Sequence, residues 1–455
     1  MKTRMNFKDE FYQKLKLLVL PIAIQNFMLA LVSATDAIML GWIDQTSLSA
    51  VSLAGQVQFV LSLFISGIAA GAGIMAAQYW GKRDAASIEK VIPIALRTNL
   101  LFSGLFTILA GFCPEILMRI FTNDAALVAS GSQYLRAVAL SYVLCGISQV
   151  YLILLKNTGH AAVSSRISST AVVLNIILNA ILIYGLCGAP ALGIRGAAYA
   201  TVAARVVELI WAYLETKKPE RVRILWNRLF SSAGKILSED FWRYTLPVLA
   251  ASLVWGIAYV LYSVIMGHMG SDAVAANSIT SIAKSLLSCL IRGVSGGAGV
   301  LIGNLLGANE LEKAREYGGR LSHLSIAIGI VTGGLLMLIS PAIVHFAPLS
   351  DTAAEYLQYM LLFCGLNLMA QSVNTTVLDG IFCAGGDAKF DMQGNIGAMW
   401  CFSVPLGFLA AFWLKLPVMV VYCIVNLDEI VKIPAVYHHY KKYIWVRNIT
   451  RDVED

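Results

Sequence analysis

One acidic residue lies in the middle of a long apolar stretch near the start of the chain. Asp36 is the only charged residue between Lys16 and Asp44. A carboxylate held in hydrocarbon costs several kcal/mol unless it is protonated or paired with a cation. Such a group can exchange a proton or Na⁺, which is the chemistry that couples transport to an ion gradient. The alternative is a plain ion pair with an arginine on another helix.

Two asparagines in a later apolar stretch have helical spacing. Asn175 and Asn179 are four residues apart, so they share one face of a helix. Their amide oxygens suit a hard cation such as Na⁺. The alternative is a hydrogen bond between helices, a common role of Asn in membranes.

Further polar residues occur in other apolar stretches. Lys284 and Arg292 are eight apart and so lie roughly on one helix face, where they could hold an anionic substrate, pair with Asp36 or Asp379, or extend to the membrane surface. Asp379 is a second acid of this kind. Arg205 and Glu208, three apart, can pair with each other. Tyr259 and Tyr262 are candidates to line a cavity for lipophilic cations, or they pack against neighbouring helices and lipid.

Several kinds of enzyme site are missing from the sequence. The six His give no His-Glu-x-x-His motif, and the eight Cys have no metal-ligand spacing. No Gly-Lys-Ser/Thr follows the glycine runs, which argues against an ATP site. We therefore expect no enzyme, no cofactor and no metal cluster, and an ion gradient of H⁺ or Na⁺ as the energy source.

The composition indicates what surrounds these residues. The chain has 455 residues, of which 58% are hydrophobic and 13% charged. A soluble protein carries about 25% charged residues, so a bilayer must cover this surface. The formal net charge of +7 comes from Lys and Arg in short loops, which is typical of membrane proteins and does not indicate a nucleic-acid partner.

Stretches without Asp, Glu, Lys or Arg recur along the chain and predict helices that cross the membrane. The predicted spans are 15–41, 50–80, 92–113, 131–155, 164–187, 194–216, 241–267, 275–306, 317–340, 355–382, 391–413 and 417–438. The sixth span contains Arg205 and Glu208, and the last contains Asp428, Glu429 and Lys432, so these two depart most from the apolar pattern.

The basic residues predict the orientation of the spans. They gather in 82–90, 217–243 and 313–320, whereas the opposite loops hold little beyond Arg119, Arg136, Arg195 and Lys415. The positive-inside rule then places both termini in the cytoplasm of a multi-pass inner (plasma) membrane protein.

The two halves of the sequence match each other. Pro21 and Pro247, Gly67 and Gly293, and the runs 71–73 and 297–299 (Gly-Ala-Gly) are each 226 residues apart. Six spans in each half give a parallel repeat related by a pseudo-two-fold axis along the membrane normal. We therefore expect an all-α fold of two six-helix bundles, an N lobe (1–216) and a C lobe with a cytoplasmic tail (241–455), joined by a linker (217–240), with substrate bound between them.

The sequence resembles the multidrug and toxic compound extrusion (MATE) family, nearest its bacterial drug-antiporter (DinF-like and NorM-like) branches. The matching pieces, in order, are Leu20-Pro21 through Asp36 to Gly41-Trp42, Gly71-Ala72-Gly73 with Gln78-Tyr79-Trp80-Gly81, Asn175 with Asn179, Gly193-Ile194-Arg195-Gly196-Ala197-Ala198-Tyr199-Ala200-Thr201, Val264-Ile265-Met266-Gly267, Gly303-Asn304-Leu305-Leu306-Gly307-Ala308 and Ala384-Gly385-Gly386-Asp387.

The resemblance implies cation-coupled export and places the cation or proton site at Asp36, Asn175, Asn179 and Thr201. Several relatives carry Asp where Asn179 stands, which leaves Na⁺ and H⁺ both open. NorM-type relatives also carry an acid in the seventh span. That span has none here and places Tyr262 opposite Asp36, so coupling is expected in the N lobe.

The expected function is an antiporter that exports small, often lipophilic or cationic organic compounds by alternating access. The alternatives are a flippase for lipid-linked sugars, which Lys284 and Arg292 keep open, and an exporter of one native metabolite. The expected partners are a small-molecule substrate and the lipid bilayer, with no nucleic acid and a monomeric chain.

Overall fold

The structure is a computed structural model that describes residues 7–451 except 44, 225, 227, 228, 230–233 and 348. The described residues form helices and the turns between them, with no strand. Their apolar character and the lack of water in a bilayer explain this, because a helix satisfies its backbone hydrogen bonds within one segment.

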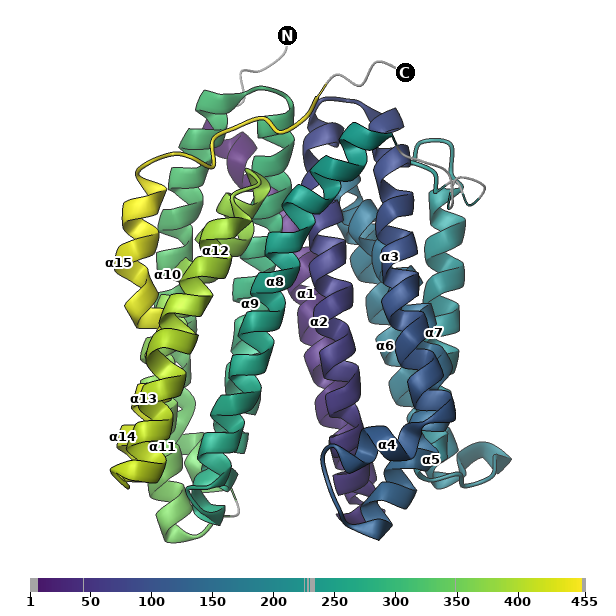
Figure 1. Cartoon of the computed structure of the whole chain (residues 1–455), viewed down its shortest axis with the longest axis vertical. Coiled ribbons are helices and arrows are strands. Elements are labelled where there is room, and N and C mark those ends of the chain that lie inside the picture. The colour runs from purple at the N-terminus through teal and green to yellow at the C-terminus, as the bar shows by residue number, and fades with distance from the viewer. Residues whose placement is uncertain are drawn as a thin grey trace. The chain divides into compact units, whose positions relative to one another are not determined.

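The helices follow the predicted spans closely (Figure 1). Those of the first half are α1 (Phe7–Gly41), α2 (Gln45–Gly81), α3 (Ala85–Phe112), α4 (Pro114–Arg119), α5 (Ala125–Leu155), α6 (Ala161–Tyr184) and α7 (Ile194–Thr216). Those of the second half are α8 (Lys235–Gly267), α9 (Ser271–Gly307), α10 (Leu311–Phe346), α11 (Asp351–Thr375), α12 (Ala388–Asn395), α13 (Val404–Phe408), α14 (Val418–Val425) and α15 (Asp428–Tyr440).

Short π-helical turns interrupt or extend several of these helices. They are η1 (Lys156–His160), η4 (Thr376–Phe382), η5 (Ile396–Ser403) and η6 (Leu409–Trp413), and the turn η2 (Leu186–Gly188) is a 3₁₀ helix. Of these five, the three π turns η4, η5 and η6 continue α11 and α12 through the tenth and eleventh predicted spans.

Ten helical runs in the described chain are long and apolar enough to cross a membrane. One of them, Ala125–Tyr184, contains both α5 and α6, so it accounts for two predicted spans. The predicted all-helical membrane fold is confirmed. The last predicted span, 417–438, differs from a single helix, because the chain leaves α14 after Val425 and begins α15 at Asp428.

The internal repeat of the sequence also appears in the positions at which the helices begin and end. Helices α2 and α9 begin at Gln45 and Ser271, and both end at a glycine in the same register. Helices α3 and α10, and likewise α5 and α11, also begin at equivalent positions. Each half therefore folds by the same local pattern of turns and helix starts.

Contacts within the chain divide it into two compact units. Among the described residues, unit 1 contains 7–26 and 250–451, and unit 2 contains 27–249. The first part of α1 thus belongs with the second half of the sequence, and the first part of α8 belongs with the first half. The division into 1–216, 217–240 and 241–455 stays a prediction about the membrane bundles.

Paired glycines explain how each unit packs against the helix segment that it takes from the other half of the sequence. A Cβ on Gly67 of α2 would lie 2.9 Å from Leu249 Cα of α8. A Cβ on Gly293 of α9 would lie 2.9 Å from Ala23 Cα of α1. These two contacts are equivalent in the repeat. Glycine is required because only a residue without a side chain lets two helix backbones approach so closely.

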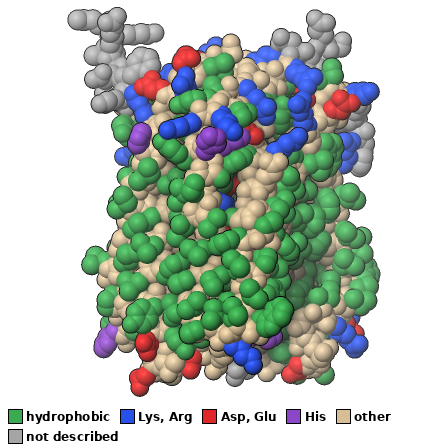
Figure 2. Space-filling model, turned by 60° about the vertical axis from the view of Figure 1, so that its left-hand side comes forward, with side chains coloured by type: hydrophobic (Ala, Val, Ile, Leu, Met, Phe, Trp, Pro, Cys, Tyr) green, Lys and Arg blue, Asp and Glu red, His purple; other side chains and the backbone are tan. Residues whose placement is uncertain are grey.

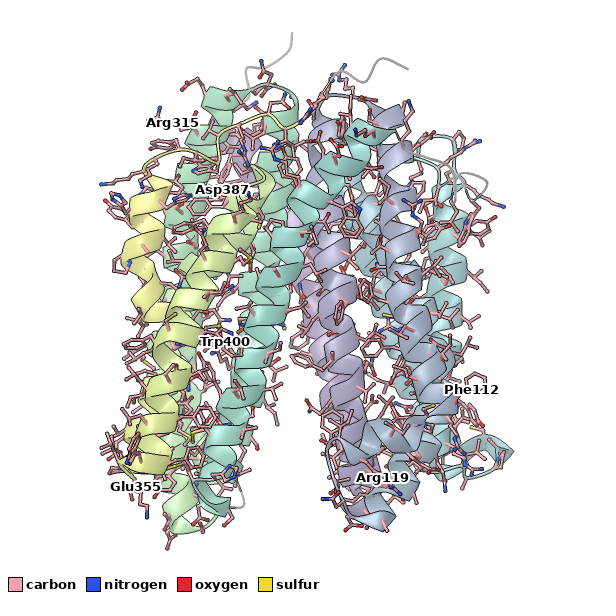
Figure 3. The ribbon with its side chains drawn as sticks, in the orientation of Figure 1. Phe112, Arg119, Arg315, Glu355, Asp387 and Trp400 are labelled. Carbon is pink, nitrogen blue, oxygen red and sulfur yellow. The ribbon has the colours of Figure 1, made fainter. Side chains whose placement is uncertain are left out.

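The distribution of side chains fits a membrane environment. The face drawn in Figure 2 is apolar over most of its height, with Lys and Arg gathered toward one end. In unit 1, Arg315 and Asp387 lie toward one end and Glu355 toward the other (Figure 3). Glu10 and Lys313 form an ion pair of 3.6 Å, so α1 starts beside the α9–α10 turn.

Candidate functional site

Asp36 lies in the part of α1 that belongs to unit 2, where it meets helix α6. Its carboxylate Oδ1 accepts a hydrogen bond of 2.6 Å from Nδ2 of Asn179. Asn179 is fully buried, whereas Asp36 keeps part of its surface accessible. The bond joins residues that are far apart in the sequence, and charged hydrogen bonds of this length are among the strong ones.

The other two residues predicted for this site continue the same network. Asn179 Nδ2 also lies 3.3 Å from Asn175 Oδ1, and Asn175 Nδ2 donates to Thr201 Oγ1 at 3.3 Å. The Thr201 hydroxyl in turn donates to the Ala197 carbonyl at 3.0 Å. Helices α1, α6 and α7 therefore bring together the four residues that the sequence singled out.

This network has more acceptors than donors. Within the part of the chain that the structure describes, Asp36 has no ion pair with a Lys or Arg, so the simple ion pair considered above is not found. Asn179 Oδ1 is buried and has no hydrogen-bond partner. A buried acceptor next to a carboxylate leaves a place for a positive group.

A cation would satisfy this imbalance directly. The network offers the Asp36 carboxylate and the unpartnered Asn179 Oδ1, with Asn175 Oδ1 already accepting from Asn179, and carboxylate and amide oxygens are ligand types that Na⁺ accepts. A proton on Asp36 would remove the same charge. The donor set therefore fits either ion, and Thr201 supports it by fixing the Asn175 amide.

The residues predicted for a substrate cavity lie in different surroundings within unit 1. Lys284 donates to Asn367 Oδ1 at 3.0 Å, while Arg292 is exposed. Tyr262 is 8% exposed and packs in the core, whereas Tyr259 is 40% exposed and stacks on Trp255. Tyr259 and Arg292 are thus accessible on unit 1, and Lys284 is held by an amide.

The charged pair in the sixth span, Arg205 and Glu208, forms a buried ion pair within one helix. Arg205 Nη1 lies 3.0 Å from both carboxylate oxygens of Glu208, and Ser148 Oγ donates to the same carboxylate at 2.6 Å. Glu208 is 1% exposed. Both charges are satisfied locally, as the three-residue spacing suggested.

A second polar group lies in unit 1, and the sequence reasoning singled out only one of its members, Asp379, as a candidate to line the substrate cavity. We call it the carboxylate–lysine cluster, and its members are Asp379 of η4, Asp391 of α12, and Asp428, Glu429 and Lys432 of α15. The signal was present, because three of these residues were noted only as departures from the apolar pattern of the last span. Ionisable residues inside a span are more often functional than accidental.

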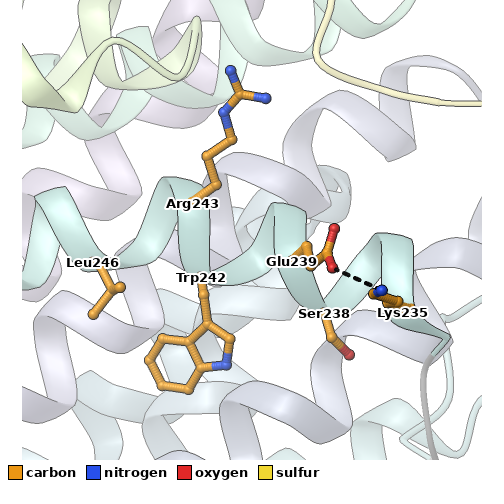
Figure 4. Close-up of a pocket in the computed structure, with 6 residues that line it drawn as sticks. All are labelled: Lys235, Ser238, Glu239, Trp242, Arg243 and Leu246. Carbon is orange, nitrogen blue, oxygen red and sulfur yellow. Dashed lines mark ion pairs between the residues drawn. The ribbon is translucent and has the colours of Figure 1, made fainter.

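A shallow pocket lies elsewhere, along the start of α8 (Figure 4). Its lining residues come from that one helix and include Trp242, Arg243 and the ion-paired Lys235 and Glu239, whose charged atoms are 4.0 Å apart. Trp beside basic residues is typical of the membrane interface. The pocket contains none of the predicted site residues.

Comparison with known proteins identifies the chain. The family model MatE matches residues 21–181 and again residues 247–409. The chain belongs to the MatE family. The two matched segments begin in the register of the internal repeat, so the family pattern is present once in each half. This confirms the resemblance to MATE transporters.

Individual relatives of this MatE family member are distant but match most of its length. The uncharacterized transporter YisQ of Bacillus subtilis is 21% identical over 94% of this chain and 93% of its own. The probable multidrug resistance protein NorM of Agrobacterium fabrum is 24% identical over 84% and 83%. A solved MOP superfamily transporter from Pyrococcus furiosus superposes with a TM-score of 0.86 at 20% identity, covering 95% and 96%, which shows the shared fold.

Proposed function

We propose that this MATE family transporter is a cation-coupled antiporter that exports small, lipophilic or cationic organic compounds by alternating access. The observation that carries the proposal is the network around Asp36, in which a partly accessible carboxylate and the orphaned Asn179 Oδ1 lack a positive partner. A carboxylate in this position costs several kcal/mol unless a proton or another cation neutralises it, and its partial accessibility lets that cation exchange.

The substrate class is supported by the relatives, several of which are described as probable multidrug resistance proteins. Export of one native metabolite fits the same site, so the probe must be a compound of the proposed class. The flippase alternative is less favoured, because the Lys284 ammonium already donates a hydrogen bond to Asn367 and is not presented to bind a pyrophosphate. We expect a monomer in the inner (plasma) membrane, with both termini cytoplasmic and lipid and substrate as its partners.

The test is transport by purified protein in liposomes loaded with ethidium. Na⁺ and pH gradients are imposed separately, each with an ionophore control that removes the gradient. We expect one of the two gradients to drive ethidium movement opposite to the cation, and the ionophore to abolish it. Ethidium movement that neither gradient accelerates would contradict cation coupling.

A further inference from the structure

Unit 1 contains a buried group of charges that the proposed coupling site does not use. In the carboxylate–lysine cluster, Lys432 Nζ lies 3.1 Å from Glu429 Oε1 and 3.7 Å from Asp428 Oδ2. The same ammonium donates to Asn395 Oδ1 at 3.2 Å, and Asn395 Nδ2 donates to Asp391 Oδ1 at 3.1 Å. One ammonium thus links two acids of α15 to an acid of α12.

These groups are shielded from solvent. Asp391, Asp428, Glu429 and Lys432 are each between 5% and 9% exposed. Asp379, which is within electrostatic range of Asp391, Glu429 and Lys432, is exposed. The cluster is therefore buried at its centre and reaches the accessible surface of unit 1 at Asp379.

The charges in this cluster do not balance. It holds four carboxylates and one ammonium. The further cations that face it are Lys284, toward Asp428 and Glu429, and Arg292, toward Asp379. Four acids against three bases leave one negative charge, and an uncompensated charge in a membrane interior is strongly unfavourable. The other titratable groups that face the cluster, Tyr262 and Cys383, are neutral in their usual state.

An unpartnered atom shows what is missing. Asn374 of α11 donates from Nδ2 to Glu429 Oε2 at 2.8 Å and to the Glu429 carbonyl at 2.6 Å. Its Oδ1 has no hydrogen-bond partner, although Asn374 is 1% exposed. Carboxylates cannot donate, so this acceptor lacks a hydrogen. Protonation of one carboxylate would supply the missing positive charge, and Asn374 Oδ1 is a buried acceptor on the amide that contacts Glu429.

The local backbone fits a site that changes state. Asp379 lies within the π turn η4, and α12 passes into the π turn η5 directly after Asn395. Helix α15 starts after a helix interruption at Asn426 and Leu427, where Asn367 Nδ2 donates to the Asn426 carbonyl at 2.6 Å. Such π turns are frequently found at functional sites.

We propose that the carboxylate–lysine cluster is a second proton-binding site, which takes up and releases one proton in each transport cycle. On uptake, a proton from water forms an O–H bond with one carboxylate oxygen, and on release that bond breaks and the proton returns to water. A proton is favoured over Na⁺ because Lys432 already occupies the position between the acids. The coupling to transport rests on the proposed function, whereas proton binding does not.

Infrared difference spectroscopy of the purified protein tests proton binding directly, through the C=O stretch of a protonated carboxyl group. The background is Asp36→Asn, which removes the carboxyl group of the proposed coupling site from the signal. We expect one band that disappears as the pH is raised. Asp391→Asn, or Asp379→Asn if the first variant fails to fold, should abolish the band, because three acids then face three bases.

Removing a base should have the opposite effect. In Lys432→Met the cluster needs a second proton, so the band should double, whereas Glu355→Gln at the far end of unit 1 should leave it unchanged. No titrating band in the background, or a band that Asp391→Asn and Asp379→Asn both leave intact, would overturn the proposal. A titration midpoint that shifts when Na⁺ replaces choline would overturn it as well, because the site would then bind Na⁺.

Discussion

At the scale of single residues, a short hydrogen-bond network decides how Asp36 behaves. Its carboxylate receives one amide hydrogen from Asn179, and that amide is itself fixed through Asn175 to Thr201. The network supplies orientation but only one hydrogen and no charge, so the negative charge of Asp36 is left for an exchangeable cation. The site is therefore sensitive to any change in its own charge.

An added carboxylate at Asn179 tests this view. Asn179→Asp places a second negative charge at hydrogen-bond distance from Asp36, so the site should hold its cation more tightly. We expect the concentration of the coupling ion that gives half-maximal transport to fall by at least about tenfold, or about one pH unit for a proton. The exposed Asn309→Asp serves as the matched control, and equal half-maximal values in both variants would contradict the account.

The residues of this network could be found from the sequence, but the assembly of the carboxylate–lysine cluster could not. Asp36 stands alone in an apolar run, and the family motif supplies its partners. The cluster is assembled from η4, α12 and α15, whose contacts no periodicity predicts. In the sequence, Asp428, Glu429 and Lys432 only make the last predicted span less apolar. Their role in a cluster becomes visible when the structure brings Asp391 of α12 close to them.

At the scale of helices, the glycines of the repeat fix which helices can touch. The close approaches of α2 to α8 and of α9 to α1 occur at equivalent glycines in the two units. The internal repeat and the helix ends could be read from the sequence. The sequence could not show that the first part of α1 packs with the second half of the chain and the first part of α8 with the first half. That arrangement depends on packing between segments over 150 residues apart.

A side chain at one of these crossings should destabilise unit 2. In Gly71→Ala the new Cβ would lie 2.7 Å from Thr245 Cα, so α2 and α8 must separate. Overpacking of this kind costs about 1–3 kcal/mol. We expect a lower thermal unfolding midpoint in detergent, measured by circular dichroism.

The matched control lies on the same helix. A Cβ on Gly55 meets no atom within 4 Å, so Gly55→Ala should leave the midpoint unchanged or raise it slightly, because Ala favours a helix over Gly. If both substitutions lowered the midpoint equally, the close approach of α2 and α8 would not explain the glycine.

At the scale of the whole molecule, the distribution of charge predicts how the chain lies in the membrane. The basic loops include the α9–α10 turn, and the start of α1 lies at this end of unit 1. The exposed Cys187 in η2 belongs to the opposite set of loops. The two sets should therefore react from opposite sides of the membrane.

Labelling of single cysteines with an impermeant maleimide measures this orientation. In a chain whose other cysteines are replaced, Cys187 should react in intact cells. Asn309→Cys, introduced with Cys187 also replaced, should react only after the membrane is permeabilised. The reverse pattern would place the termini outside and refute the orientation proposed from the basic loops.

The central claim is that Asp36 carries the coupling cation, and one substitution tests it most directly. Asp36→Asn keeps the size of the side chain and its contact with Asn179 but removes the charge. The control is Asp124→Asn, an exposed N-cap of α5 where Asn serves equally well. We predict that Asp36→Asn inserts and binds ethidium yet loses transport driven by an ion gradient, while the control retains it. Gradient-driven transport at the wild-type rate in Asp36→Asn would contradict the account.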